Sequence, residues 1–156
     1  MTSSTFAQPL PPDFRDNAAT GYRANGRPIE GEWHTYPEQA AAGLWTTPAD
    51  LATFAIALQQ AAAGHPSPVL SRTLAREMLR RHVENWGLGV GIHGQGAATC
   101  FGHSGANEGF RAVWIGYRDQ ASGVVVMTNS DAGVAVGSDL LPIVAREYGF
   151  QGLGPG

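Results

Sequence analysis

The residues best suited to chemistry lie together in the segment 101–110, which reads Phe-Gly-His-Ser-Gly-Ala-Asn-Glu-Gly-Phe. It is the densest cluster of polar residues and glycines in the chain. An acyl-transfer site needs backbone N–H groups aimed at the developing oxyanion, and glycine on a strand edge lets a substrate lie alongside that strand. The segment offers an imidazole at His103, a hydroxyl at Ser104 and clearance at Gly105. It is therefore our candidate site for acyl-transfer chemistry.

The rest of the sequence limits which mechanisms this segment can serve. The ten residues counted as lysine plus arginine are all arginines, so every mechanism that needs a lysine is excluded within this chain. The one cysteine, Cys100, excludes an intrachain disulfide and a cysteine-rich zinc site, and we predict that it is a small buried hydrophobe. The remaining histidines lack the close spacing and nearby carboxylates of a zinc site: His34, His65, His82 and His93. We therefore predict no metal and no cofactor.

A nucleophile elbow is one alternative for this segment, with Gly102-His103-Ser104-Gly105-Ala106 standing for Gly-x-Ser-x-Gly and Ser104 as the nucleophile. An elbow is followed by a helix, and its catalytic histidine comes after the serine in the chain. Here strand-forming residues follow, and His103 is the last histidine. The sequence therefore disfavours an α/β-hydrolase.

The elements that must position this segment begin with a loop and a helical region. Residues 1–45 hold scattered prolines and no sustained period, which predicts a long irregular stretch lying over other structure. Residues 46–84 form the helical region. Thr-Pro-Ala-Asp at 47–50 supplies a cap hydroxyl, a first-turn proline and a carboxylate, which predict the start of a helix. Gly-His-Pro at 64–66 is expected to end this helix. A second helix is predicted over 72–81, with Ser71 as its cap.

Residues 85–130 carry the signals of antiparallel strands. Residues 86–93 alternate glycine with apolar side chains, a strand pattern that lets another element approach the backbone closely. Residues 110–117 and 123–128 are rich in aromatic and β-branched residues, and the short polar connection between them predicts an antiparallel hairpin. The run Val-Val-Val-Met at 124–127 predicts burial on both faces.

A final helix is predicted over residues 133–149. Gly149 stops it, and Pro142 fits only if the helix begins at Ser138 or Asp139 or kinks at the proline. The predicted fold class is α/β, of the α+β type. It consists of an antiparallel sheet of about three strands with the C-terminal helix packed on it, preceded by the helical region and the long loop.

Chain length limits the number of domains, and net charge limits the classes of partner. The 156 residues suffice for one domain, spanning 1–156, and the net charge of -3 provides no basic face for nucleic acid or an anionic membrane. Residues 1–20 lack the basic start and apolar stretch of a signal peptide, and no run approaches the ~18 apolar residues of a membrane span. We expect a soluble chain, and the compartment stays open.

Several ordered segments make the chain similar to one family, the serine β-lactamases, penicillin-binding proteins and related esterases. His103-Ser104-Gly105 resembles the family's His-x-Gly or Lys-Thr-Gly strand motif, and residues 107–110 resemble its Asn-x-Gly-Phe. Three further segments agree: residues 1–5 with the stretch after Pro-Leu-Gly, 42–51 with Ala-Gly-Gly-Leu-x-Ser-Thr-x-x-Asp-Leu, and 124–129 with Val-Val-Val-Leu-Thr-Asn.

The resemblance implies a role for each residue of the motif. His103 stands where the family places a histidine or lysine facing the nucleophile, and the N–H of Ala106 corresponds to one oxyanion donor. Ser104, with clearance from Gly105, is expected to reach a substrate carboxylate or carbonyl. Asn107 is a candidate substrate-binding residue, although a turn residue organising the bend at 106–109 is the simpler interpretation. Histidine in place of lysine favours esterase or peptidase-like members over dedicated β-lactamases.

The family's nucleophile motif Ser-x-x-Lys and its Tyr-x-Asn motif do not occur in this sequence. In the family both precede the position that Met1 matches. The resemblance therefore implies a C-terminal fragment, inactive alone, of a serine hydrolase acting on an ester, amide or β-lactam.

The alternative is a non-catalytic ligand-binding or regulatory module derived from the family. In the family, N-terminal elements complete the sheet. Without them we expect an exposed edge strand, and hence self-association or binding of the missing N-terminal half.

Overall fold

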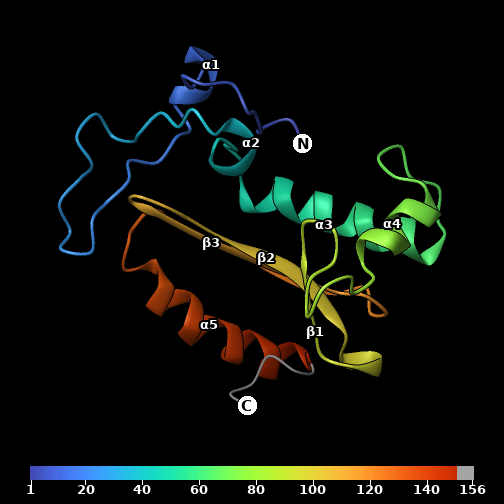
Figure 1. Cartoon of the computed structure of the whole chain (residues 1–156). Helices are drawn as coiled ribbons and strands as arrows, with labels where there is room; N and C mark the ends of the chain where they lie inside the picture. The colour runs from blue at the N-terminus through green and yellow to red at the C-terminus, as the bar shows by residue number, and fades with distance from the viewer. Residues whose placement is uncertain (151–156) are drawn as a thin grey trace.

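A four-stranded antiparallel sheet with helices on both faces organises residues 1–150, the part of the chain that the computed structural model describes (Figure 1). The single predicted domain extends to residue 156, so its last six positions, 151–156, lie outside the described residues. The elements follow in the order α1 (Pro12–Arg15), α2 (Gln39–Ala42), α3 (Pro48–Ala63), α4 (Arg72–Met78), β1 (Gly91–His93), a 3₁₀ turn (Gly96–Ala98), β2 (Cys100–Asn107), β3 (Phe110–Tyr117), β4 (Gly123–Thr128) and α5 (Gly133–Tyr148).

The strands are hydrogen-bonded in the order β1-β2-β3-β4, each antiparallel to its neighbour. The long helix α3 packs on one face of the sheet and α5 lies across the other (Figure 1). The mixed α/β composition, the antiparallel sheet and the C-terminal helix confirm the predicted fold class. The sheet has four strands where about three were expected, because β1 and β2 are separate strands.

Both capped helices begin where their sequences predict. The amide of Asp50 donates to the Thr47 hydroxyl at 3.2 Å, and α3 ends at Gly64, whose φ of 101° needs a residue without a side chain. The hydroxyl of Ser71 likewise caps α4. That helix ends at Met78, earlier than predicted.

The strand prediction for residues 86–93 is wrong over 86–90. Only Gly91–His93 is regular strand, and Gly89 has a φ of 73°, a left-handed conformation that interrupts an extended run. A Cβ at Gly87 would lie 2.1 Å from the carbonyl oxygen of Met78. The glycines therefore permit the close approach that the pattern indicated, but in a bend and not in a strand.

The hairpin of β3 and β4 is confirmed, with Trp114 opposite Val125. The apolar run at 124–127 is only half-buried, so the prediction of full burial on both faces is wrong. β4 is the last strand in the hydrogen-bonded order of the described sheet. It meets α3 on one face and α5 on the other, but no described strand covers its outer edge.

The C-terminal helix begins earlier than Pro142 suggests. α5 starts at Gly133, where a Cβ would lie 1.6 Å from the Thr128 hydroxyl oxygen, so glycine lets the helix begin against the end of β4. Pro142 lies inside the helix, where it cannot supply the amide that the carbonyl of Ser138 would accept. Gly149 caps the helix with a φ of 68°, as predicted.

The hydrophobic core lies between α3 and the sheet. The rings of Phe101 and Trp114 meet edge to face with centroids 5.7 Å apart, and Leu58 of α3 is fully buried in the same cluster. Cys100 is buried, as predicted, and burial raises the pKa of its thiol. Burial also raises the pKa of its cross-strand partner Tyr117, to about 12.

Residues 1–45 are irregular apart from the single turns α1 and α2. Ser4 and Thr5 fix the start of this segment: the Ser4 hydroxyl donates to the Asp50 carboxylate at 2.7 Å, and Thr5 pairs with Trp45. The hydrogen bond from Ser4 lowers the pKa of Asp50. Among the described helices, none is both long enough and apolar enough to cross a membrane.

Candidate functional site

The edge of β2 that carries the candidate residues is open. The carbonyl of Thr99 accepts from the amide of Arg118 at 3.0 Å, which fixes the phase of the β2–β3 ladder. Because bonded and non-bonded pairs alternate in an antiparallel ladder, the main-chain groups of Ser104 and Ala106 point away from β3. On that side β1 pairs only as far as Gly102. Within residues 1–150, no strand pairs with this edge at Ser104 or Ala106.

His103 lies exposed on the face of the sheet that α3 covers. Its ring centroid is 5.5 Å from that of Trp86, which is itself half-exposed. Its Nδ1 lies 2.5 Å from the carbonyl oxygen of Ser104. A carbonyl oxygen can only accept, so Nδ1 carries the proton of this hydrogen bond and Nε2 is left free.

Ser104 points to the opposite face from His103, because successive side chains on a strand alternate. Its side chain lines a pocket of about 450 Å³ between the sheet and α5, with Val113, Val126 and Leu141 among the apolar walls. Ser104 also lies inside a continuous strand and pairs with Val113. The strand-to-helix turn of a nucleophile elbow is therefore absent at Ser104.

Gly105 has space that the described part of the chain does not fill. A Cβ built there would meet only the Cβ of Ala112, at 3.8 Å, which is an ordinary contact. At Gly102, by contrast, a Cβ would lie 2.0 Å from the carbonyl oxygen of Trp114. Packing within residues 1–150 thus explains glycine at 102 but does not explain it at 105.

Asn107 does not organise the bend at 106–109, so that simpler interpretation is wrong. Its amide Nδ2 donates to the carbonyl of Ala42 at 2.8 Å, although the two residues are 65 positions apart in the sequence. The bend is held instead by Asp131, whose carboxylate accepts from the amide of Gly109 at 2.9 Å and lies 3.0 Å from the Arg111 guanidinium. Asn107 therefore fixes the N-terminal segment beside the end of β2.

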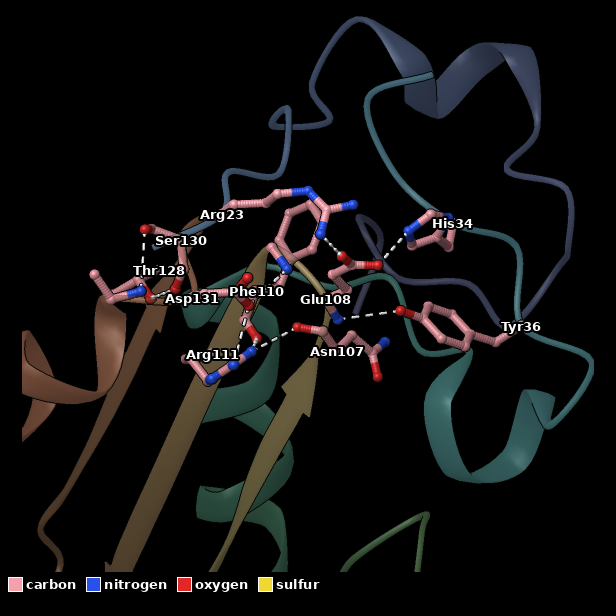
Figure 2. A network of polar contacts seen from close by, with 12 residues as sticks. Arg23, His34, Tyr36, Asn107, Glu108, Phe110, Arg111, Thr128, Ser130 and Asp131 are labelled. Carbon is pink, nitrogen blue, oxygen red and sulfur yellow. Dashed lines mark hydrogen bonds and ion pairs between the residues drawn. The ribbon is translucent and has the colours of Figure 1, made fainter. Parts of the chain in front are cut away.

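Sequence reasoning missed the residues that surround this bend. Glu108 forms an ion pair with Arg23 and a hydrogen bond with His34, whose Nε2 lies 2.6 Å from the carboxylate, and the Glu108 amide donates to the Tyr36 hydroxyl at 3.1 Å (Figure 2). No local pattern links these residues, since the pairing depends on how residues 20–42 fold back over β2 and β3. No group of three or more potential metal ligands occurs among residues 1–150.

Comparison with known proteins gives one family match and one structural match. A model of the Beta-lactamase family matches residues 1–146. A solved structure described as the crystal structure of SurE superposes with a TM-score of 0.65 at 26% sequence identity, covering 85% of this chain. The chain spans 33% of the length of that structure. No curated protein matches the sequence.

Proposed function

We propose, from the premise that this chain belongs to the beta-lactamase family, that β2 forms the substrate and oxyanion wall of a serine hydrolase site. The nucleophile of this site would come from a segment outside the present sequence, because a chain without lysine cannot contain Ser-x-x-Lys. The observation that best supports the proposal is the open edge of β2, where the N–H of Ala106 faces outward beside an exposed His103.

Each residue of β2 has a role in this proposal. The N–H of Ala106 donates to the oxyanion that forms when an ester, amide or β-lactam carbonyl is attacked. Gly105 leaves room for the substrate, and Ser104 and Asn107 contact its polar groups. His103 presents its free Nε2 toward the nucleophile. A water-excluding partner on this face is needed, since the imidazole is exposed in the chain alone.

Complementation tests this function. The chain alone should not hydrolyse p-nitrophenyl acetate or nitrocefin, and addition of a separately expressed N-terminal half from the parent gene should give turnover of at least one of them. Turnover by the chain alone that is lost in Ser104→Ala would overturn the proposal in favour of a Ser104 nucleophile. Reversible binding of an acyl substrate by the mixture, without turnover, would instead identify the regulatory module.

The open faces of the chain support a partner requirement. The outer edge of β4 has no described neighbour, and α5 exposes Val134, Leu140 and Ile143 to solvent. Free strand edges and contiguous apolar side chains both promote association. We expect sedimentation velocity to show a concentration-dependent oligomer of the chain alone and a heteromer after the N-terminal half is added. A monodisperse monomer across micromolar concentrations would contradict this.

A further inference from the structure

The hairpin bend after β2 is the place where the N-terminal segment is attached to the candidate site. Residues 20–42 lie across this bend, and Glu108 and Asn107 hold them; Figure 2 shows the contacts of Glu108. The Glu108 carboxylate binds Arg23 and His34, the Glu108 amide donates to Tyr36, and Asn107 donates to Ala42.

Packing at the bend also requires close approach. Gly109 has a φ of 84°, and a Cβ there would lie 2.8 Å from the Ile29 side chain and 2.9 Å from the Cα of Gly21. A Cβ at Gly21 would in turn lie 2.6 Å from the ring of Phe110. Two glycines thus allow the N-terminal segment to lie directly against the bend, where the polar contacts can form.

The start of the N-terminal segment is held by further bonds: the main chain of Tyr22 bonds to Gly109, Asn129 and Asp131, and the Asn129 side chain donates to the carbonyl of Thr20. The rest of the segment has few buried contacts. Between residues 20 and 42 the only helix is the single turn α2, and Ile29 is the one fully buried large apolar residue. A segment with few buried contacts opens locally at low free-energy cost, so its position depends on its polar attachments. The attachments of residues 23–36 to the bend include both a side-chain and a main-chain contact of Glu108.

We propose that Glu108 is a positioning residue, which holds residues 22–36 against the bend and thereby fixes the end of β2. The proposed oxyanion donor, Ala106, lies two positions before Glu108 on the same strand end. A bend that moves carries the Ala106 N–H with it. The effect of Glu108 on catalysis rests on the proposed function. The attachment of residues 22–36 by Glu108, which we call the clamp, does not depend on it.

The solvent exposure of the clamp residues allows a positioning role of Glu108 to be distinguished from a contribution to global stability. The side chains of Glu108, Arg23 and His34 are 35–49% exposed. Ion pairs at such sites add little to global stability. A purely stabilising residue would lower the unfolding midpoint, whereas a positioning residue loosens the segment and slows catalysis at nearly unchanged stability.

The first experiment measures amide hydrogen exchange in the chain alone. Residues 21–36 are tied by internal bonds, including Gly21 to the carbonyl of Glu32 and Ile29 to the carbonyl of Gly21, both at 2.8 Å. In Glu108→Gln these amides should exchange roughly 5- to 10-fold faster, because the carboxylate that binds both Arg23 and His34 is lost. Arg23→Gln should give a smaller increase in the same amides. The matched control is Glu77→Gln, which breaks an exposed pair with Arg80 and should leave this exchange unchanged.

The second experiment uses the reassembled protein. Glu108→Gln should lower kcat for p-nitrophenyl acetate by roughly 10-fold, since a displacement of a fraction of an ångström misaligns the donor. KM should stay within about two-fold, and the unfolding midpoint within about 4 °C. Unchanged exchange at residues 21–36 overturns the clamp, whether or not the mixture is active. An active wild-type mixture whose kcat is unaffected by Glu108→Gln overturns the positioning role. A wild-type mixture without turnover overturns the proposed function and leaves the exchange result to decide the clamp.

Discussion

Replacement of Ala106 by proline should lower turnover of p-nitrophenyl acetate by the reassembled enzyme by about 100- to 1,000-fold, the usual effect of removing one oxyanion donor. The substitution deletes a single N–H. That N–H points to the open edge of β2 and takes no part in the ladder with β3. Strand edges accept proline where the amide faces outward, so the fold should survive. Steady-state kinetics, with circular dichroism of the same samples, would measure both.

Two control variants distinguish loss of a donor from loss of the strand. Ala106→Gly keeps the N–H and should retain turnover within a few-fold. Gly105→Pro removes an N–H that faces β3, so it should destabilise the chain through a lost ladder bond. Turnover by Ala106→Pro within two-fold of the wild type would remove Ala106 from the oxyanion site.

Elements with local chemical signals could be predicted from the sequence. Thr47 and Ser71 cap helices because a hydroxyl beside a helical start satisfies a free amide, a relation that spans three residues. The β3–β4 hairpin follows from two apolar runs and a short polar connection. In each case the stabilising contact lies within the pattern that was read.

Features that depend on distant contacts could not be predicted. The bend at residues 86–90 exists because Gly87 lies against the carbonyl of Met78 and Gly89 adopts a left-handed backbone, whereas alternating glycines alone look like a strand. The attachments of Asn107 and Glu108 join residues at least 65 positions apart in the sequence. Such pairs become neighbours only after the N-terminal segment has folded over the sheet.

The same distinction between local signals and distant contacts applies to the position of the candidate residues on the sheet. The motif at 103–106 predicts which residues form the site, but which groups face the open edge depends on the ladder with β3 and on the short reach of β1. The pleat then places His103 and Ser104 on opposite faces. Their side chains therefore have different neighbours. Spacing in the sequence does not show which neighbours each side chain has.

The second prediction with a large expected effect concerns the hydrophobic core that supports β2. Phe101→Ala should destabilise the chain by about 3–5 kcal/mol, the usual cost of truncating a buried aromatic ring. The Phe101 ring is 1% exposed and packs edge to face on Trp114. A domain of this size has only about 5–15 kcal/mol of stability, so the variant should be partly unfolded at 37 °C. Urea denaturation followed by circular dichroism would measure the change.

Phe6→Ala is the matched control, because that ring is half-exposed and its loss should cost no more than about 0.5 kcal/mol. A loss below 1 kcal/mol in Phe101→Ala would mean that the core between α3 and the sheet does not support β2. Phe101 and His103 share one face of the strand, two residues apart. The buried part of β2 therefore fixes the position of its exposed part. Phe101→Ala should impair the site even though Phe101 contacts no substrate.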